Sequence, residues 1–171
     1  TASLNTFRTA PEKFFHWFRP LANQIFHAQP NPAHTALAEF EQAGYQNTII
    51  TQNIDGLHQK AGSKQVVEMH GTLRTLSCTQ CYKKFPSEEF LKPFIENGTL
   101  PYCINCNGLL KPDVILFGEQ LPQAAWQTAQ RATRQCDLML VAGSSLEVLP
   151  VAGLPIQALD HGAHLIIINN T

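Results

Sequence analysis

The chain has 171 residues, of which 44% are hydrophobic and 15% are charged, and its formal net charge is −1 at pH 7. This length suits one ordinary domain with a small insertion, and the near-neutral balance excludes the basic surface on which nucleic-acid-binding proteins rely. No apolar run approaches the ~20 residues needed to cross a bilayer. Because no signal peptide opens the sequence, we expect an intracellular, cytoplasmic protein with neither nucleic acid nor membrane as a partner.

Helices and short apolar strands are expected to alternate along the first part of the chain. Asn31 caps a predicted helix, Pro32 fits its first turn, and Gly44 ends it. A short buried strand is predicted over residues 47–51, and another over residues 66–70.

The last third of the chain repeats this alternation. Helical patterns cover residues 123–135 and, despite Pro155, residues 151–160, whereas apolar strands cover residues 138–142 and 164–169. Strands that are apolar throughout and alternate with helices imply a parallel sheet covered on both faces. The predicted fold class is therefore α/β.

Short motifs rich in polar residues follow three of the predicted strands directly. They are Gln52, Asn53, Ile54 and Asp55 after the first strand, Gly143, Ser144 and Ser145 after the third, and Asn169 and Asn170 after the last. In an open parallel sheet, ligands bind at the carboxyl ends of the strands. Each motif alone could be an ordinary turn, since Gly, Ser, Asn and Asp are common in turns. The three together favour a site for a ligand that carries ribose and phosphate.

Four cysteines form two C-x-x-C pairs, Cys78 with Cys81 and Cys103 with Cys106. Two such turns can hold one metal in a tetrahedron of sulfur ligands, which selects zinc, leaves no open position and so predicts a structural site. The alternatives are two disulfides or unrelated buried thiols, but nothing in the sequence supports an oxidising compartment. The fifth cysteine, Cys136, precedes an apolar strand and is expected to be a small core residue.

The segment that carries these cysteines has little periodic sequence. A short helix is expected over residues 87–97, where Pro93 is a potential break. We interpret the segment as a small insertion between the strand at residues 66–70 and the return segment at residues 111–119.

His70 is the candidate general base. An isolated histidine is more often structural than catalytic, but histidine titrates near pH 6.5 when unperturbed and suits proton transfer. Gly71 follows it and permits a close approach of the backbone, and the polar motifs flank it in the sequence. The other six histidines have weaker claims, and of these His34 and His58 are interpreted as structural.

These motifs resemble those of the sirtuins, which are NAD-dependent protein-lysine deacylases. The similarity follows the family's order from about residue 11 to the last residue. The matching stretches are Q-P-N-P-A-H at 29–34, T-Q-N-I-D-G-L-H at 51–58, K-A-G at 60–62, E-M-H-G at 68–71, the four cysteines, K-P-D-V-I-L-F-G-E at 111–119, G-S-S-L-E-V-L-P at 143–150 and I-I-N at 167–169. The resemblance implies a Rossmann-like NAD-binding domain over residues 29–72 and 112–171, a helical part of a small domain over residues 1–28 and a zinc-binding module over residues 73–111.

The resemblance also implies how NAD, the co-substrate, would be bound. The catalytic residues would be His70, a base acting through a ribose hydroxyl, and Asn53, which would contact the nicotinamide-side ribose. The other contacts would come from Gln52, Ile54 and Asp55 on the nicotinamide side and from Gly143, Ser144, Ser145 and Asn169 on the phosphate and adenosine side.

An acyl-lysine protein or peptide would bind as an added strand, a mode in which main-chain hydrogen bonds give affinity with little sequence preference. The backbone carbonyl of Ile115 would bind the acyl-lysine amide, and Phe117 would wall the aliphatic stem. The peptide would lie between two backbone segments, formed by Phe117, Gly118 and Glu119 and by Glu147, Val148 and Leu149. Transfer of the acyl group would give free lysine, nicotinamide and O-acyl-ADP-ribose, while one zinc ion stays structural.

The sequence departs from the family pattern at both ends. The N-terminal G-A-G-x-S turn, which would supply amides for the pyrophosphate, and the C-terminal part of the sheet are absent from the 171 residues. We therefore expect these residues alone to be inactive and the complete protein to be a deacylase. The alternatives are a non-catalytic remnant that acts as a binding module, and an NAD-dependent mono-ADP-ribosyltransferase.

One pair of positions in the sequence predicts which class of acyl group the substrate pocket accepts. A branch of the family that removes acidic acyl groups has a Y-x-x-R pair, which aligns here with Phe18 and Leu21. Neither side chain can pair with a buried carboxylate, which is costly without a partner, although Arg19 is adjacent in the sequence. Simple packing of a helix would also explain both residues. Either interpretation predicts a pocket for acetyl or longer apolar acyl groups.

Overall fold

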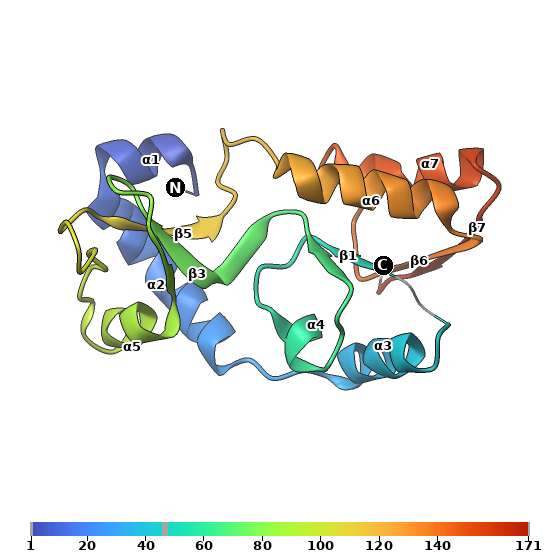
Figure 1. Cartoon of the computed structure of the whole chain (residues 1–171), viewed down its shortest axis with the longest axis horizontal. Helices are drawn as coiled ribbons and strands as arrows, with labels where there is room; N and C mark the ends of the chain where they lie inside the picture. Colours follow the sequence, from blue (N-terminus) through green and yellow to red (C-terminus); the bar gives the residue numbers. More distant parts are fainter. Residues whose placement is uncertain (1, 46–47, 171) are drawn as a thin grey trace. The chain divides into compact units, whose positions relative to one another are not determined.

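The structure is a computed structural model that describes residues 2–45 and 48–170 (Figure 1). The chain divides into two compact units, Thr1–Leu121 and Pro122–Thr171. Asn47, the first residue of a predicted strand, lies outside the described residues. No helix in the described part of the chain combines the length and the apolarity that crossing a membrane requires.

The first unit mixes helices with short strands. In chain order its elements are α1 (Leu4–Thr9), α2 (Pro11–His27), α3 (Pro32–Gln42), β1 (Ile49–Thr51), α4 (Leu57–Lys60), β2 (Val66–Glu68), β3 (Gly71–Cys78), β4 (Lys84–Pro86), α5 (Glu88–Asn97) and β5 (Leu110–Val114). The helix predicted from Pro32 and the parallel pairing of β1 with β2 are both confirmed. The second strand is shorter than predicted, because Met69 and His70 form a turn that leads into β3.

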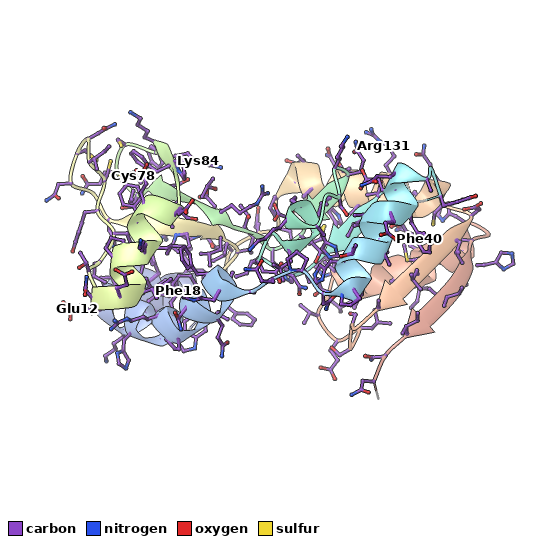
Figure 2. The ribbon with its side chains drawn as sticks, turned by 90° about the horizontal axis from the view of Figure 1, so that it is seen from below. Glu12, Phe18, Phe40, Cys78, Lys84 and Arg131 are labelled. Carbon is purple, nitrogen blue, oxygen red and sulfur yellow. The ribbon has the colours of Figure 1, made fainter. Side chains whose placement is uncertain are left out.

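An aromatic core joins α2 to α5. Phe14, Phe15 and Phe18 recur at helical spacing on α2, and each is at most 1% exposed. The ring of Phe18, which is labelled in Figure 2, stacks on that of Phe94 in α5, and the two ring centroids are 6.2 Å apart. Such aromatic pairs add about 0.5–1.5 kcal/mol beyond the burial of their area. Pro93 lies inside α5 without breaking it, so the predicted helix is confirmed.

Arg19 of α2 makes a second connection to α5. Its guanidinium donates two hydrogen bonds to the carbonyl of Ile95, at 2.9 and 2.7 Å, and one to that of Glu96, at 2.8 Å. The last carbonyls of a helix have no partner within the helix, so these bonds satisfy groups that would otherwise need water. These three hydrogen bonds hold the guanidinium of Arg19 at the C-terminal end of α5.

A three-stranded antiparallel sheet, in the order β4-β3-β5, supports the cysteine-bearing segment. The sequence predicted little regular structure there, but Leu76 and Leu110 are fully buried beside Phe85 and two of the cysteines. Their burial gives the insertion a small core of its own, separate from the aromatic core.

The second unit contains two parallel strands and their helices. Its elements are α6 (Gln123–Gln135), β6 (Leu138–Ala142), the 3-10 helix η1 (Val151–Gly153), α7 (Leu154–Asp160) and β7 (His164–Ile168). The limits of α6 and β6 agree with the prediction, and β6 pairs with β7 in parallel register. Figure 1 shows α6 and α7 on the same side of the two strands.

Two expectations for the second unit differ from the structure. Apolar side chains of its strands, such as Leu138 (48% exposed) and Ile167 (52% exposed), are open, so among the described residues the unit covers only one face of its sheet. Cys136 was expected in the core but ends α6 half-buried, where its thiol donates to the carbonyl of Thr133 at 3.2 Å. The thiol lies there because the chain leaves the helix at this residue.

Gly71 connects the turn at His70 to β3 and tolerates no side chain. Its φ is +72°, and a Cβ atom placed on it would overlap the backbone carbonyl of Asp113 in β5. We expect Gly71→Ala to lower the free energy of unfolding by about 3 kcal/mol or more, because left-handed strain of about 1–2 kcal/mol adds to the cost of separating two paired strands. Urea denaturation of the complete gene product measures this.

Gly44→Ala is the matched control for that prediction. Gly44 also has a positive φ, +80°, but no atom in the described part of the chain lies within 4 Å of an added Cβ. It should therefore show only the conformational cost, about 1 kcal/mol. Equal losses for the two variants would contradict the steric argument.

Candidate functional site

The loop that follows β1 holds the first predicted motif. The hydroxyl of Thr51 accepts a hydrogen bond from the backbone N–H of Asn53 at 3.1 Å, and the carboxylate of Asp55 accepts one from the N–H of Leu57 at 2.9 Å. The carbonyl of Ile54 accepts the N–H of Leu73 in β3 at 2.9 Å. The loop is thus fixed at its start, in its middle and at its junction with α4, which gives its side chains a defined direction.

His70 lies against this loop. Its Nδ1 atom is 3.1 Å from the backbone oxygen of Gln52. Because a carbonyl oxygen can only accept, Nδ1 must carry the proton of that hydrogen bond, which leaves Nε2 of the neutral ring with a free lone pair. The backbone oxygen of His70 accepts the N–H of Ile115 at 2.8 Å. The structure therefore brings together His70, the first strand-end motif and the start of the predicted peptide-binding segment.

The segment after β5 forms a tight turn. The N–H of Glu119 donates to the carbonyl of Leu116 at 2.9 Å, and the φ of +92° at Gly118 is that of the third residue in a type II turn. Phe117 stands at the tip, 77% exposed. Its N–H donates to the carbonyl of Ala2 at 2.9 Å, and its carbonyl accepts the N–H of Leu4 at 3.0 Å.

These bonds refine the predicted peptide contacts. Both backbone groups of Phe117 and the N–H of Glu119 are already used within the chain. Within the described residues, the N–H and carbonyl of Gly118 and the carbonyl of Ile115 have no protein partner. An added strand on this segment would use those groups, whereas Phe117 would contribute its exposed ring.

The second and third strand-end motifs meet in the second unit. The N–H of Gly143 donates to the carbonyl of Ile168 at 2.9 Å, and the amide of Asn169 donates to the carbonyl of Ser144 at 3.2 Å. The hydroxyl of Ser144 accepts the N–H of Leu146 at 3.3 Å. The predicted neighbours at the ends of β6 and β7 are thus in contact. Four further predicted residues of this unit are exposed: Ser145, Glu147, Val148 and Leu149.

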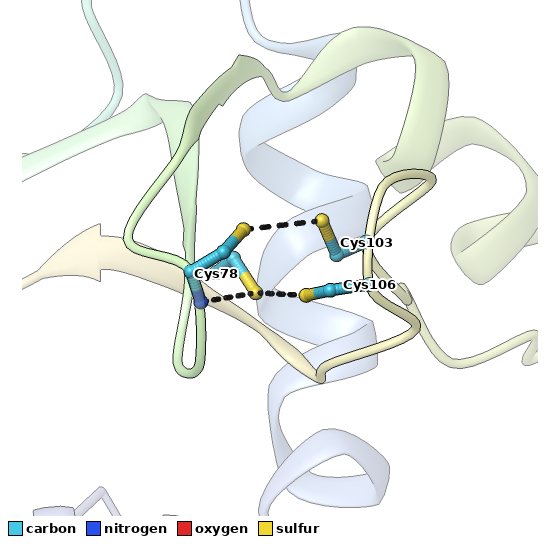
Figure 3. Close-up of side chains that lie close together, drawn as sticks. Cys78, Cys103 and Cys106 are labelled. Carbon is cyan, nitrogen blue, oxygen red and sulfur yellow. Dashed lines mark hydrogen bonds between the residues drawn. The ribbon is translucent and has the colours of Figure 1, made fainter.

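The four predicted zinc ligands converge, although they come from two separate segments (Figure 3). The sulfur atoms of Cys78, Cys81, Cys103 and Cys106 all lie within 4.8 Å of one another, and no disulfide joins them. Two of the separations are 3.4 Å, between Cys78 and Cys106, and 3.7 Å, between Cys81 and Cys103. A regular tetrahedron with Zn–S bonds of ~2.3 Å has sulfur atoms about 3.8 Å apart.

The two C-x-x-C turns have the same backbone form. In each, the residue after the second cysteine, Tyr82 or Asn107, has a φ of 58° and donates its N–H to the carbonyl of the first, at 3.1 Å for Cys78 and 2.9 Å for Cys103. Two non-glycine residues in the left-handed region are unusual, and both turn a chain around the same point. Gly108 completes the enclosure, because a Cβ there would lie 2.9 Å from the sulfur of Cys78.

Backbone N–H groups point at two of the four sulfur atoms. Those of Gln80 and Cys81 lie 3.4 and 3.5 Å from the sulfur of Cys78, and that of Asn105 lies 3.4 Å from the sulfur of Cys103. Burial alone would raise the pKa of the Cys78 thiol, but the N–H groups of Cys81 and Gln80 outweigh it and lower the pKa to about 6. Four converging cysteine sulfur atoms fit one structural zinc ion with no open coordination position.

His34 and His58, interpreted as structural from the sequence, lie together. Their ring centroids are 4.7 Å apart. His34 completes a capping box with Asn31, since the Asn31 side chain accepts the N–H of His34 at 3.1 Å. Burial and then the nearby His34 lower the pKa of His58. Neither ring approaches His70 through a hydrogen bond among the described residues, so their arrangement agrees with a structural role.

Lys111 is a site residue that the sequence alone did not single out. Its ammonium lies 2.9 Å from the carboxylate of Glu119, at the opposite end of the turn-bearing segment. The available signal was the pair of opposite charges that bracket the K-P-D-V-I-L-F-G-E motif at residues 111–119.

Comparisons with known proteins place this geometry in a family. The model of the Sir2 family matches residues 1–150. A curated NAD-dependent protein deacetylase from Thermodesulfovibrio yellowstonii is 45% identical over 162 residues, which are 95% of this chain. The chain spans 63% of the length of that relative.

Solved structures give the same result. The structure of Sir2Tm bound to a propionylated peptide superposes with a TM-score of 0.92 at 39% identity, covering 99% of this chain and 71% of that one. A complex of Sir2, p53 peptide and NAD+ superposes with a TM-score of 0.89 at 39% identity, covering 99% of this chain and 70% of the other. With its histidine, its strand-end motifs and its four cysteines arranged as described, the chain belongs to the Sir2 family, the sirtuins.

Proposed function

We propose that the complete gene product is an NAD-dependent protein-lysine deacylase, a transferase that moves the acyl group from lysine to ADP-ribose and releases nicotinamide. The observation that carries this proposal is the position of His70, bound through Nδ1 to Gln52 and through its backbone to Ile115. This one residue connects the candidate nicotinamide-side loop to the candidate acyl-lysine segment. The activity named for the deacetylase relative supports the same reading.

His70 would act as a general base at Nε2. The Gln52 carbonyl holds the proton on Nδ1 and so keeps Nε2 available to accept a proton from a ribose hydroxyl. Asn53 is exposed beside this position, whereas Gln52, Ile54 and Asp55 are half-buried around it. We assign the nicotinamide side of NAD to these four residues. NAD supplies the electrophilic ribose carbon when it is bound.

The phosphate and adenosine side of NAD would be held in the second unit. Gly143 has a φ of +63°, and no atom of the described residues lies within 4 Å of an added Cβ, so we propose that its backbone is open to a phosphate. We assign Ser144, Ser145 and Asn169 to phosphate and ribose contacts, supported by the bond from Asn169 to the carbonyl of Ser144. Short polar side chains and exposed amides at the ends of parallel strands suit such a ligand.

The acyl-lysine protein or peptide would bind as a strand. The carbonyl of Ile115 would accept the acyl-lysine amide, and Gly118 would supply the open backbone groups beside Glu119. The exposed ring of Phe117 would wall the lysine stem. The second backbone segment beside the peptide would come from the exposed residues Glu147, Val148 and Leu149.

Zinc would hold the small module together and take no part in the chemistry. We propose module limits of 73–111, with a helical part of the small domain over residues 1–28 and the NAD-binding domain over residues 29–72 and 112–171. We propose a cytoplasmic location, supported by the cysteines being free of disulfides, which are rare in reducing compartments. Neither nucleic acid nor membrane is proposed as a partner.

The structure also bears on the acyl group. Phe18 is 1% exposed in the aromatic core, and Arg19 is bound to the carbonyls of Ile95 and Glu96. Neither is free to pair with a carboxylate on the substrate, and Leu21 packs against the same core. An acidic acyl group would therefore bury an unpaired charge.

Acetyl- and propionyl-lysine peptides are expected to be better substrates than a succinyl-lysine peptide by at least ~10-fold in kcat/KM. Side-by-side rates with the complete gene product, with and without NAD, measure this. An activity that ignores NAD would overturn the proposed function. A preference for succinyl-lysine would leave the function intact and show that a cation outside α2 pairs with the carboxylate.

A further inference from the structure

An ion pair lies behind the turn that the peptide is proposed to contact. Lys111 precedes the turn and Glu119 ends it, and their side chains are 17% and 21% exposed. A lysine ammonium has three N–H donors. Here they face the carboxylate of Glu119 at 2.9 Å, the carbonyl of Val114 at 2.9 Å and the carbonyl of Pro112 at 3.2 Å. All three donors are therefore used inside the segment itself.

Glu119 closes the turn from the other end. The same carboxylate oxygen that faces Lys111 accepts the N–H of Leu116 at 2.8 Å, while the N–H of Glu119 donates to the carbonyl of Leu116. Both backbone groups of Leu116 are thus bound by one residue. Because the N–H of Leu116 and the carbonyl of Ile115 lie in one planar peptide unit, the carboxylate also helps to fix the direction of the Ile115 carbonyl.

The arrangement separates the groups that hold the turn from those that would bind a ligand. Lys111 and Glu119 satisfy backbone groups on the inner side of the segment. The carbonyl of Ile115 and the backbone of Gly118 are left for an added strand, as described above. A segment that must present backbone groups to a partner loses affinity if it has to be ordered on binding.

We propose that Lys111 and Glu119 are positioning residues that hold the turn at residues 116–119 in the form that binds the acyl-lysine peptide. The inference rests on the proposed function, because it assigns a task to these residues within the same peptide site. It goes beyond that function in predicting that a side chain which does not face the peptide determines peptide affinity. Neither residue is proposed to contact NAD or to transfer a proton.

The test compares Lys111→Met with two matched variants of the complete gene product. Lys111→Arg keeps the charge and the donors. Lys84→Met breaks another ion pair of the same sheet, that of Lys84 with Asp113 of β5 at 3.1 Å, which does not reach the turn. The readouts are KM for an acetyl-lysine peptide, KM for NAD, kcat, and the Kd of a fluorescein-labelled acetyl-lysine peptide measured by anisotropy without NAD.

Lys111→Met should raise the peptide KM and Kd about 10- to 100-fold, since a small displacement of positioning groups has effects of this size. KM for NAD should stay unchanged, which separates peptide positioning from general unfolding. Lys111→Arg should retain most of the peptide affinity, and Lys84→Met should match the wild type. Glu119→Gln, which can still accept the N–H of Leu116, should fall between wild type and Lys111→Met.

Two results would overturn the inference. One is a peptide Kd for Lys111→Met equal to that of the wild type. The other is a parallel rise in KM for NAD in Lys111→Met, which would show a purely structural effect. In both cases the wild type still deacylates the peptide, so the proposed function stands. If the wild type neither binds nor deacylates the peptide, the proposed function fails and the inference fails with it.

Discussion

Replacing His70 with alanine is expected to lower the deacylation rate by about 10²–10⁴-fold, the usual cost of losing a general base. The reason is the bond from Nδ1 to the carbonyl of Gln52, which leaves Nε2 as a proton acceptor beside the first strand-end motif. The backbone of His70 should continue to accept the N–H of Ile115, because alanine retains the carbonyl. NAD affinity should therefore change little, and kcat should carry the loss.

His161→Ala is the control for this prediction. His161 is exposed, and its ring bonds only the carbonyl of Gln157 one turn earlier, at 2.8 Å. Its removal should leave kcat, both KM values and NAD binding unchanged. A His70→Ala variant that keeps most of the wild-type rate would remove His70 from the mechanism.

Loss of zinc is expected to unfold the cysteine-bearing module. Structural zinc contributes about 10–16 kcal/mol of apparent binding free energy in small zinc-dependent folds, and that energy is coupled to folding. The core that surrounds Cys78 and Cys103 is small, so the module has little else to hold its two turns together. Freshly purified protein should contain one equivalent of zinc, and Cys103→Ser should lose both the metal and much of its solubility.

Elemental analysis and thermal melting measure this outcome. Cys136→Ser is the matched control, because Cys136 is the one cysteine outside the cluster and bonds only to the carbonyl of Thr133. It should keep a full equivalent of zinc and a melting temperature close to that of the wild type. Less than half an equivalent of zinc in unchelated wild-type protein would contradict the assignment.

Regular local patterns made most helices and the parallel strands predictable. α6 has the predicted limits because its apolar residues recur at helical spacing, and β6 has them because it is a short run that is apolar throughout. β3 was not predicted because its buried residues Leu73 and Leu76 are three positions apart, across an irregularity in the register, and because it pairs with β5, more than thirty residues away. Such long-range pairing leaves little signal in a local stretch of sequence.

In the candidate site, too, contacts that follow from local patterns could be predicted, whereas contacts that depend on tertiary packing could not. The meeting of Ser144 with Asn169 followed from the rule that parallel strands end at one edge. The commitment of Arg19 to the end of α5 could not be predicted, because it depends on how two helices pack. The contacts of Lys111 could not be predicted from the sequence for a related reason. Two of its three hydrogen-bond acceptors are backbone carbonyls, and only the folded turn defines the directions of these groups.

The most direct test of the central claim is product analysis by mass spectrometry. The complete gene product would be incubated with an acetyl-lysine peptide and NAD, and all small products would be quantified. Deacylation through His70 and a bound NAD predicts equal amounts of free lysine peptide, nicotinamide and O-acetyl-ADP-ribose. Release of acetate from the peptide while NAD stays intact would contradict the account.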